Sequence, residues 1–597
     1  MLTYNAPLSD IRFVLTHLIG MEKLAALPGY DSINDELAFA VLDEAARLAR
    51  EVFAPLNQTG DKQGARFFNN VVTTPTGFKE AYRAHVDGGW NGLAIESELG
   101  GQGLPWTIAM TVQELWQSAN MALALCTLLN QGAIELLAAH GSEALKTKYL
   151  PKMVTGDWTG TMNITEPQAG SDVGAVRCKA ERAGDHFLIT GQKIFISYGD
   201  HDMADNIIHF VLARLPDAPE GTRGLSLFLV PKLMVKDDGS LGEPNDVRVV
   251  SIEHKLGQHA GPTCIMAFGD KEGAIGYLVG EENGGIAGMF TMMNNARIGV
   301  GVQGLALMER SYQLARNYAK MRVQSRDVAK PKEPPVLIIK HPDVRRMLMT
   351  MRSQTEAARA LALMCAFAID TSKRETDAAQ KRAATERVDL LTPVIKAWFT
   401  DLSNEVASLG VQVFGGMGYV EESGAAQHMR DARVLSIYEG ANGIHANDLV
   451  FRKLARDNGT AFRVMIAEVD AFLAELKKQS GEAFASMYKN LSLSLVKLLE
   501  TGIWIIQQAK ADPSKAAAGA APFLRLTGNT LGGFYLIQSA YLAQKDLTAG
   551  TGDANYLTAK IATARFYAEH ILPQNIGLSA TVVEGSTATL GMPETAF

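Results

Sequence analysis

The chain has 597 residues, a net charge of −7 and 47% hydrophobic residues. This length exceeds a single hydrophobic core and predicts about three or four domains. The acidic balance, with no basic stripe, argues against nucleic-acid binding. The four cysteines form no CxxC pair, which argues against a zinc site or a disulfide framework and fits a reducing compartment. No secretory pattern and no apolar run of ~18 residues is present, so we expect a cytoplasmic protein.

Helical spacing of apolar residues dominates residues 1–160. It is clear over residues 33–52 and again over residues 107–137, after the Gly-rich loop at 98–105. These segments predict an N-terminal helical domain.

Residues 161–284 change character to short strands separated by Gly, Asp and Pro clusters. Because no long helices intervene, the pattern favours an antiparallel sandwich or barrel over a parallel sheet. The expected strands cover residues 187–190, 193–197, 207–214, 225–231, 247–253 and 263–268.

Helical periodicity returns over residues 285–456 and predicts a helical bundle. The expected helices run over residues 289–321, 341–369 and 385–409, with a proline-containing loop at 324–337. A fourth unit, residues 457–597, is also predicted to be helical, and an Ala/Gly/Pro stretch at 512–522 is expected to divide it by a loop. The predicted fold class is mainly α with a middle antiparallel β domain and an additional C-terminal helical domain.

Three sequence patterns resemble known functional motifs, but the residues around them do not support those functions. Gly299, Gly301 and Gly304 match G-x-G-x-x-G, but the residues before them look helical, so small residues that let two helices approach are preferred to a dinucleotide site. The histidines are widely spread without HExxH, so no metal site is expected. Ser171 lies in AGSD rather than G-x-S-x-G, which argues against a serine hydrolase.

Three segments carry information together: MNITEPQAGSD at 162–172, KIFIS at 193–197 and IYEGANG at 437–443. Alone, they are a turn, a strand and a loop with a solvated glutamate. With LGGQGLP at 99–105, VFGGMGY at 413–419 and the Arg430–Asp431 pair, they resemble the acyl-CoA dehydrogenase family in order and context. The resemblance implies an N-terminal helical domain, a middle β domain and a helical bundle, with FAD between the last two.

The resemblance implies a desaturation in which an acyl-CoA thioester loses its α-proton to a base and a β-hydride to flavin N5. Thr165 and Ser197 are hydroxyl residues that can donate to the polar edge of the flavin. Phe195 replaces the tryptophan that the family usually places against the ring, and Ser171 corresponds to a residue near both the flavin pyrophosphate and acyl-CoA. The complete set of flavin contacts implied for this domain is Met162, Ile164, Thr165, Gly170, Ser171, Phe195 and Ser197.

The resemblance also implies that a second subunit binds the adenosine diphosphate half of FAD. Arg322 matches the family arginine that reaches the neighbour's FAD diphosphate, and Gln412 and Gly416 match positions that meet the adenosine diphosphate portion. Arg322 has a plainer interpretation as a solvated charge. If the resemblance holds, the protein is a homodimer or a dimer of dimers.

Glu439 is the predicted base. A solvated glutamate has a pKa near ~4.3, and burial beside an acyl chain would raise it toward neutrality. Tyr438 adds an apolar wall on one side of it, and Gly440 removes bulk beside the substrate. Some family members carry the base immediately before an arginine of the substrate helix, but here Ala296 precedes Arg297.

Asn294 and Arg297 lie on the helix that the family uses against the CoA moiety, where arginine suits a phosphate or an adenine plane. The loop after the base departs from the usual TSxI, since it reads Ala441, Asn442, Gly443, Ile444. The family's side-chain contacts to FAD from this loop are therefore in doubt, and Asn442 is a candidate to replace them.

The C-terminal unit narrows the resemblance to a bacterial branch that includes 3-methylmercaptopropionyl-CoA dehydrogenase, and also resembles very-long-chain acyl-CoA dehydrogenases. Its amphipathic helices are expected to pack within the dimer, with membrane contact as the less favoured alternative. The expected activity is FAD-dependent dehydrogenation of a fatty acyl-CoA, with an electron-transfer flavoprotein as acceptor. The alternatives are 3-(methylthio)propanoyl-CoA as substrate, an acyl-CoA oxidase that uses oxygen, and a non-catalytic flavin-binding relative.

Overall fold

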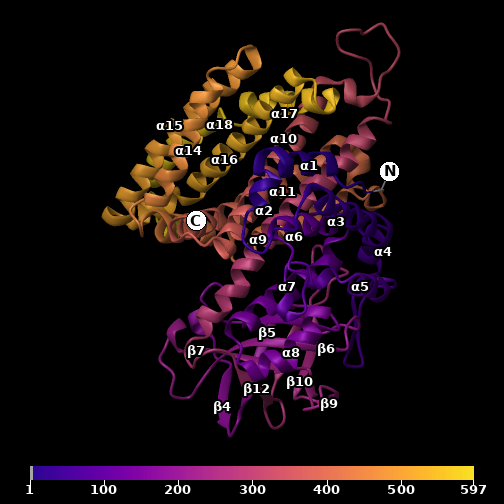
Figure 1. Ribbon diagram of the computed structural model, residues 1–597, viewed down its shortest axis with the longest axis vertical. Coiled ribbons are helices and arrows are strands. Elements are labelled where there is room, and N and C mark those ends of the chain that lie inside the picture. Colours follow the sequence, from indigo (N-terminus) through magenta and orange to yellow (C-terminus); the bar gives the residue numbers. More distant parts are fainter. Residues whose placement is uncertain (1–3) are drawn as a thin grey trace. The chain divides into compact units, whose positions relative to one another are not determined.

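The computed structural model describes residues 4–597, so the first three residues of the predicted non-secretory N-terminus lie outside it. The chain divides into two compact units. Figure 1 shows the chain coloured from the N-terminus (indigo) to the C-terminus (yellow). Unit 1 comprises the chain up to Glu44, Pro105–Glu114 and Val300–Phe597, and unit 2 comprises Ala45–Leu104 and Leu115–Gly299. Three helices run from one unit into the other: α3 (Asp35–Leu48), α6 (Trp106–Ala119) and α9 (Gly285–Ala319).

Unit 2 combines helices with an eight-stranded sheet. Its helices are α4 (Pro55–Gln63), α5 (Phe78–Asp87), α7 (Met121–His140) and α8 (Glu143–Thr155). A hairpin of β1 (Arg66–Phe68) and β2 (Val71–Thr73), absent from the sequence prediction, interrupts the helical N-terminal part. The remaining strands are β3 (Trp158–Asn163), β4 (Lys179–Ala183), β5 (His186–Ser197), β6 (Asn206–Arg214), β7 (Leu225–Pro231), β8 (Leu233–Val235), β9 (Leu241–Pro244), β10 (Val247–Ile252), β11 (Thr263–Phe268) and β12 (Ala274–Leu278).

The sheet confirms a middle β domain of mainly antiparallel strands. Its order is β10-β11-β5-β12-β7-β6-β3, with β4 paired to β5 and β6. One departure from the prediction is that β3 runs parallel to β6, with Trp158 opposite Asn206. Every residue of β7 is buried, as are all but the last of β6, because these central strands are covered on both faces.

Helix α7 needs separate comment because it is long and apolar. By length and composition it is the one helix among the described residues that could cross a membrane, contrary to the expectation that no segment qualifies. However, 89% of its most apolar window is buried inside the protein. The core helix of a folded domain passes the same test, so this is weak evidence for a membrane span.

The described part of unit 1 is mainly helical, with a loop at 320–337 that contains one β-bridge, between Val323 and Leu337. The short helices α1 (Leu8–Phe13) and α2 (Met21–Ala25) precede the bundle formed by the second part of α9 with α10 (Pro342–Arg374), α11 (Ala378–Phe414), α12 (Ala425–Ala432) and α13 (Asn442–Asn447). The three long helices expected between residues 289 and 409 are all present. Helix α9 starts four residues earlier and ends two residues earlier than predicted, α10 ends five residues later, and α11 extends further at both ends.

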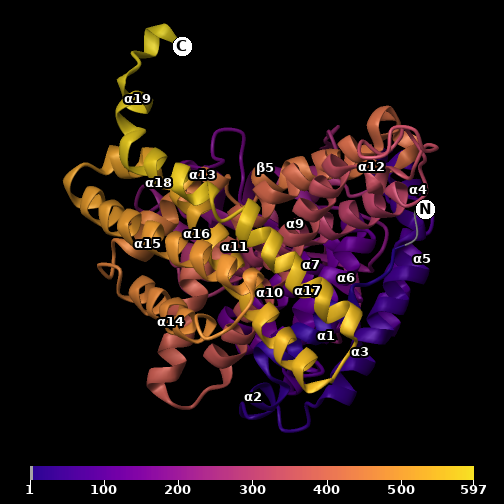
Figure 2. The ribbon, with the colours of Figure 1, turned by 90° about the horizontal axis from the view of Figure 1, so that it is seen from above.

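The C-terminal residues form further helices of unit 1, which confirms the additional C-terminal helices of the predicted fold class and places them in the same compact unit as the helical bundle. They are α14 (Thr460–Leu476), α15 (Glu482–Ala511), α16 (Pro513–Ala549), α17 (Ala554–His570), α18 (Gln574–Glu584) and α19 (Ser586–Gly591). Figure 2 shows α15, α16 and α17 side by side, as does Figure 1. Helix α16 lies close to Trp398 of α11: a Cβ added at Gly528 or Gly532 would come within 2.4 Å of the Trp398 ring.

Two predictions about glycine- and proline-rich segments have opposite outcomes. The expected loop at 512–522 is wrong, because Pro513 starts α16 and the alanine-rich stretch continues as helix through Pro522. Proline is tolerated in a first turn, and the high helix propensity of alanine decides the rest. In contrast, Gly299, Gly301 and Gly304 lie inside α9, as expected. A Cβ at Gly301 would come within 2.4 Å of Ile395, so these glycines do permit close helix approach.

Candidate active site

The loop after β3 is anchored in unit 2 by a buried ion pair. Glu166, 4% exposed, accepts a 2.8 Å hydrogen bond from the ammonium group of Lys193, which is fully buried in β5. Two backbone N–H groups, those of Arg177 and Cys178, also donate to the Glu166 carboxylate. Burial opposes ionisation, but these donors hold the pKa of Glu166 below its ordinary value. The loop therefore has a fixed path beside β5.

A β-bulge in β5 then turns one side chain out of the sheet. Cys264 of β11 pairs with Ile196, whereas Met266 pairs with Lys193, so Ile194 and Phe195 together form the irregularity. The N–H of Ile194 donates to the carbonyl of Thr165 at 2.9 Å instead of to β11. Phe195 has a φ of 60° and its side chain is 60% exposed. Bulges of this kind re-aim side chains near active sites.

The predicted flavin contacts of unit 2 lie along this loop and bulge. Met162, Ile164, Thr165 and Ser197 are half-buried, and Phe195 is exposed. Gly170 and Ser171 are exposed as well, and a Cβ at Gly170 would meet nothing within 4 Å. An exposed aromatic ring with hydroxyl groups nearby fits a planar ring with a polar edge, which is the shape and chemistry of a flavin.

The substrate-helix residues lie on the part of α9 that belongs to unit 2. The Arg297 guanidinium is centred 5.5 Å from the Phe290 ring and donates to the Asn294 side chain at 3.4 Å. Asn294 is exposed and Arg297 half-buried. Ala296, the position where some relatives carry the base, is buried and has no acidic group.

Arg322, Gln412 and Gly416 lie at the ends of two packed helices of unit 1. Tyr318 of α9 stacks on Phe414 of α11 with ring centroids 4.0 Å apart, which brings the two helix ends together. Arg322 follows the first helix and Gln412 and Gly416 lie at the end of the second, and all three are exposed. A Cβ at Gly416 would meet nothing within 4 Å, so backbone groups there are accessible to a phosphate.

Glu439 lies in a short loop of unit 1 with unusual backbone geometry. Glu439 has a φ of 55° and Gly440 a φ of 90°, so two consecutive residues are left-handed. The side chain of Tyr438 donates to Gln303 on α9. The ring of His445 bonds to the carbonyl of Glu439 at 2.9 Å. Left-handed glutamate persists only when its surroundings fix it, and such positions concentrate at functional sites.

Beneath this loop lies a buried lysine of α11. Lys396 is 0% exposed and donates to the carbonyl of Gly440 at 2.6 Å and to Oδ1 of Asn442 at 2.9 Å. The amide nitrogen of Asn442 donates in turn to Asp401 and Thr400 of the same helix. Both ends of the Asn442 amide are thus engaged within the bundle. A contact between Asn442 and FAD stays a prediction.

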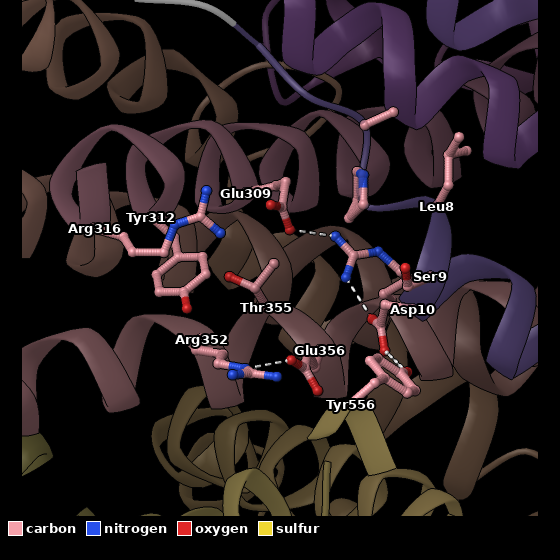
Figure 3. A pocket seen from close by; sticks show the side chains of 13 residues that line it. Leu8, Ser9, Asp10, Glu309, Tyr312, Arg316, Arg352, Thr355, Glu356 and Tyr556 are labelled. Carbon is pink, nitrogen blue, oxygen red and sulfur yellow. Dashed lines mark hydrogen bonds and ion pairs between the residues drawn. The ribbon is translucent and has the colours of Figure 1, made fainter. Parts of the chain in front are cut away.

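A separate cavity in unit 1 contains none of the predicted site residues. It has a volume of about 220 Å³ and is lined by α1, α9, α10 and α17 (Figure 3). At its base Arg359, 1% exposed, pairs with Asp10, Glu114 and Glu309 at 2.6–2.7 Å. Burial opposes ionisation of Asp10, but Lys560 and Arg359 hold its pKa far below the ordinary value. These carboxylates are occupied by cations, so the cluster holds helices together and offers no base.

Comparison with known families covers most of the chain. The N-terminal, middle and C-terminal domain models of acyl-CoA dehydrogenase match residues 36–157, 161–270 and 283–454, and a model described as acetyl-CoA dehydrogenase C-terminal like matches residues 465–593. A 3-methylmercaptopropionyl-CoA dehydrogenase of Ruegeria pomeroyi is 46% identical over 96% of both chains. The chain belongs to the acyl-CoA dehydrogenase family. It is an oxidoreductase, and FAD is its cofactor.

Two further similarities concern this acyl-CoA dehydrogenase's length and fold. A butyryl-CoA dehydrogenase of Syntrophomonas wolfei is 34% identical over 100% of this chain and 99% of its own. The solved structure of Caenorhabditis elegans ACDH-11 in complex with C11-CoA has a TM-score of 0.76, covering 97% of this chain and 95% of that one at 21% identity. The additional C-terminal helices therefore belong to an architecture that other family members share.

Sequence reasoning missed the residues that hold the site in place. Glu166, Lys193, Lys396 and His445 act on the predicted residues through hydrogen bonds to their backbone or their loop. A lysine within an otherwise apolar helical stretch, such as Lys396 in TPVIKAWF, was the one available signal. Its partners could not be read, because they lie 44 and 46 residues further along the chain.

Proposed function

We propose that this acyl-CoA dehydrogenase removes the α-proton of an acyl-CoA thioester with Glu439 and yields the trans-2-enoyl-CoA. The observation that carries the proposal is the backbone of Glu439, which is left-handed and held by hydrogen bonds on both sides of the loop. A fixed carboxylate is what proton abstraction requires, since general bases act within hydrogen-bond reach of the proton they remove.

The remaining residues divide between binding and orientation. FAD held here would supply the acceptor for the β-hydrogen, which leaves as hydride. The loop anchored by Glu166, with Thr165, Ser197 and the exposed Phe195 ring, supplies hydroxyl donors and an aromatic face to the cofactor. Arg297 and Asn294 supply a cation and an amide for the phosphate and adenine groups of CoA.

The test is anaerobic reduction of the bound flavin by substrate. Glu439→Gln keeps the shape of the side chain but removes the base, so we expect FAD and acyl-CoA to bind while flavin reduction falls by about 10⁴-fold or more. Glu475→Gln, at an exposed glutamate of α14 that pairs with Lys478, is the matched control and should bleach at the normal rate. Normal bleaching in Glu439→Gln would exclude this residue as the base.

A second candidate concerns the substrate: 3-(methylthio)propanoyl-CoA in place of a linear fatty acyl-CoA. The 46% identity to a 3-methylmercaptopropionyl-CoA dehydrogenase favours it, whereas the butyryl-CoA dehydrogenase at 34% identity supports short linear chains. Pentanoyl-CoA is the matched comparison, because it differs only by a methylene group in place of sulfur. A preference of more than about tenfold for one of the pair in flavin reduction decides between them.

The electron acceptor is proposed to be an electron-transfer flavoprotein. Support comes from family membership, and the alternative is direct oxidation by oxygen. Hydrogen peroxide released at the rate of substrate turnover in air would replace this part of the proposal by an oxidase. The four cysteines are free and buried, which is consistent with the proposed cytoplasmic location.

The proposed assembly is a homodimer in which Arg322, Gln412 and Gly416 meet the partner's FAD. Its support is the exposed end of unit 1, where these polar groups accompany the exposed apolar side chains of Met417 and Tyr419. Arg322→Ala should lower FAD content at equal dimer content, measured by absorbance and light scattering. A monomer that retains full FAD would contradict it.

A further inference from the structure

We propose that the cavity of unit 1 is a binding site for one small oxyanion, a phosphate or a carboxylate, held by Arg316, Tyr312 and Arg352. Arg316 and Tyr312 come from α9 and Arg352 comes from α10, and all three side chains line the cavity. The site is separate from the loop that carries Glu439, so the inference goes beyond the proposed function and does not rest on it.

The cavity has two unlike sides (Figure 3). On one side, Asp10 pairs with both Arg359 and Lys560, and Glu356 pairs with Lys560 as well. Each carboxylate there has a cationic partner from the protein itself. The other side carries the three side chains named above, and its positive charge is less completely compensated.

Arg316 is the cation of this cavity that lacks a carboxylate. It is half-buried, its Nε and Nη2 donate to the side-chain oxygen of Asn317 at 3.2 Å, and its guanidinium is centred 5.5 Å from the ring of Tyr312. Within residues 4–597 no carboxylate pairs with Arg316, and its Nη1 has no acceptor. A planar guanidinium with an unoccupied edge suits a phosphate or a carboxylate, which it can bind with two parallel hydrogen bonds.

Arg352 adds two further donors beside the Tyr312 hydroxyl. Its Nε donates to Glu356 at 2.7 Å, whereas its Nη1 and Nη2 have no acceptor in the part of the chain that the structure describes. Burial raises the pKa of Tyr312, and the positive charges of Arg352 and Arg316 oppose this rise, so both cations lie near the phenol. The Tyr312 hydroxyl itself has no hydrogen-bond partner among the described residues. Donors from α9 and α10 thus meet at one side of the cavity.

The size of the cavity limits the ligand. Its volume of about 220 Å³ holds about seven water molecules at ~30 Å³ each, and pockets for drug-sized ligands begin at ~300 Å³. An acyl-CoA or a dinucleotide is therefore too large, whereas inorganic phosphate or a short organic acid fits. The carboxylates of Asp10 and Glu356 on the opposite side disfavour a longer polyanion, since like charges repel.

The experiment titrates the FAD-loaded full-length protein with inorganic phosphate, and separately with lactate, by calorimetry in a chloride buffer of constant ionic strength. We expect at least one of these anions to bind at one site per chain, with a dissociation constant in the millimolar range or below. Arg316→Gln and Arg352→Gln should each weaken this binding by about 10–100-fold, because each removes a charged donor. Arg382→Gln, at an exposed arginine of α11 that lies 3.9 Å from Glu386, is the matched control and should bind as the parent protein does.

The melting temperature without added anion shows whether the variants fold. Arg316→Gln leaves no carboxylate unpaired, and Arg352→Gln leaves Glu356 paired with Lys560, so both should melt within about 3 °C of the parent protein. If either variant does not fold, Tyr312→Phe decides, since it removes only the hydroxyl and should weaken binding several-fold.

Two results support the proposal and distinguish the ligands. Binding of phosphate alone makes the ligand a phosphate, and binding of lactate alone makes it a short carboxylic acid, provided that the arginine variants weaken it. Absence of saturable binding for both anions overturns the proposal. Equal binding in the parent protein and in both arginine variants also overturns it, because the anion then binds elsewhere.

Discussion

Two of the buried cationic side chains of unit 1, Arg359 and Lys396, have surroundings that differ in kind. Arg359 lies among three carboxylates, those of Asp10, Glu114 and Glu309, and its charge is fully neutralised. Lys396 is equally buried, but its hydrogen bonds lead to a carbonyl and an amide of the base loop, which carries Glu439. The first cluster ties α1, α6, α9 and α10 together, whereas the second set of bonds controls a single loop.

This difference in hydrogen-bond partners indicates whether a buried cation stabilises the packing of helices or the conformation of one loop. A neutralised cluster has no field left to act on a substrate, and its removal is expected to change stability above all. Lys396 bonds to the loop that carries Glu439, and the Asp401 carboxylate acts on it electrostatically, so its removal is expected to change that loop first. The predictions below change one side of this comparison or a buried neutral group of the same unit, and they measure stability, flavin reduction or both.

The largest expected effect is on the stability of the Arg359 cluster. Arg359→Met leaves Asp10, Glu114 and Glu309 without their shared partner, and breaking a buried pair in this way costs about 3–5 kcal/mol. The midpoint of urea unfolding measures it. Molecules that remain folded should still reduce their flavin normally. Arg12→Ala, which removes an exposed pair with Asp43, is the control and should stay within about 1 kcal/mol.

The buried neutral histidine His428 is expected to have an intermediate effect on stability. Burial, with the nearby Arg310 and Arg430, lowers the pKa of His428 from 6.5 to about 3. The unfolded histidine binds a proton below pH 6.5 and the folded one only near pH 3, so stability is lost as pH falls between these values. At pH 5 the loss from this residue is about 2 kcal/mol.

His428→Gln should therefore lose about 2 kcal/mol less than the parent protein between pH 7.5 and pH 5. Urea unfolding at the two pH values measures the difference. Equal losses in both proteins would show that His428 is protonated in the folded state and that its surroundings tolerate a third cation.

Gly440→Ala should separate stability from function in the base loop. The φ of 90° strains any Cβ, and the added carbon would lie 3.0 Å from Nε2 of His445. The expected loss of stability is about 1–2 kcal/mol, smaller than for Arg359→Met, while flavin reduction falls by about 10–100-fold. At Gly443 a Cβ would meet nothing within 4 Å, so Gly443→Ala should leave both measurements nearly unchanged. A normal reduction rate in Gly440→Ala would show that the loop adapts without moving Glu439.

The sequence allowed prediction of the order of helical and β regions, the helical context of Gly299–Gly304 and the position of Glu439 in a loop. These features depend on local spacing, which short segments retain. The bulge at Phe195 could not be predicted, because it depends on which residues of β11 lie opposite, some 70 positions away. The same limit hid Lys396 and the Glu166–Lys193 pair. The loop wrongly expected at 512–522 was based on the Ala/Gly/Pro composition of this stretch, in which the high helix propensity of the alanines prevails.

The smallest expected effect is that of Asn442→Ser, which restores the hydroxyl that the family usually has here. Serine cannot reach Asp401 and Lys396 together, so Asp401, whose pKa burial already raises, loses an amide donor. One lost hydrogen bond of this kind costs about 1 kcal/mol. Because Lys396 keeps its bond to the Gly440 carbonyl, flavin reduction should fall by about threefold or less. A loss of more than about tenfold would instead show that the Asn442 amide controls the position of the loop.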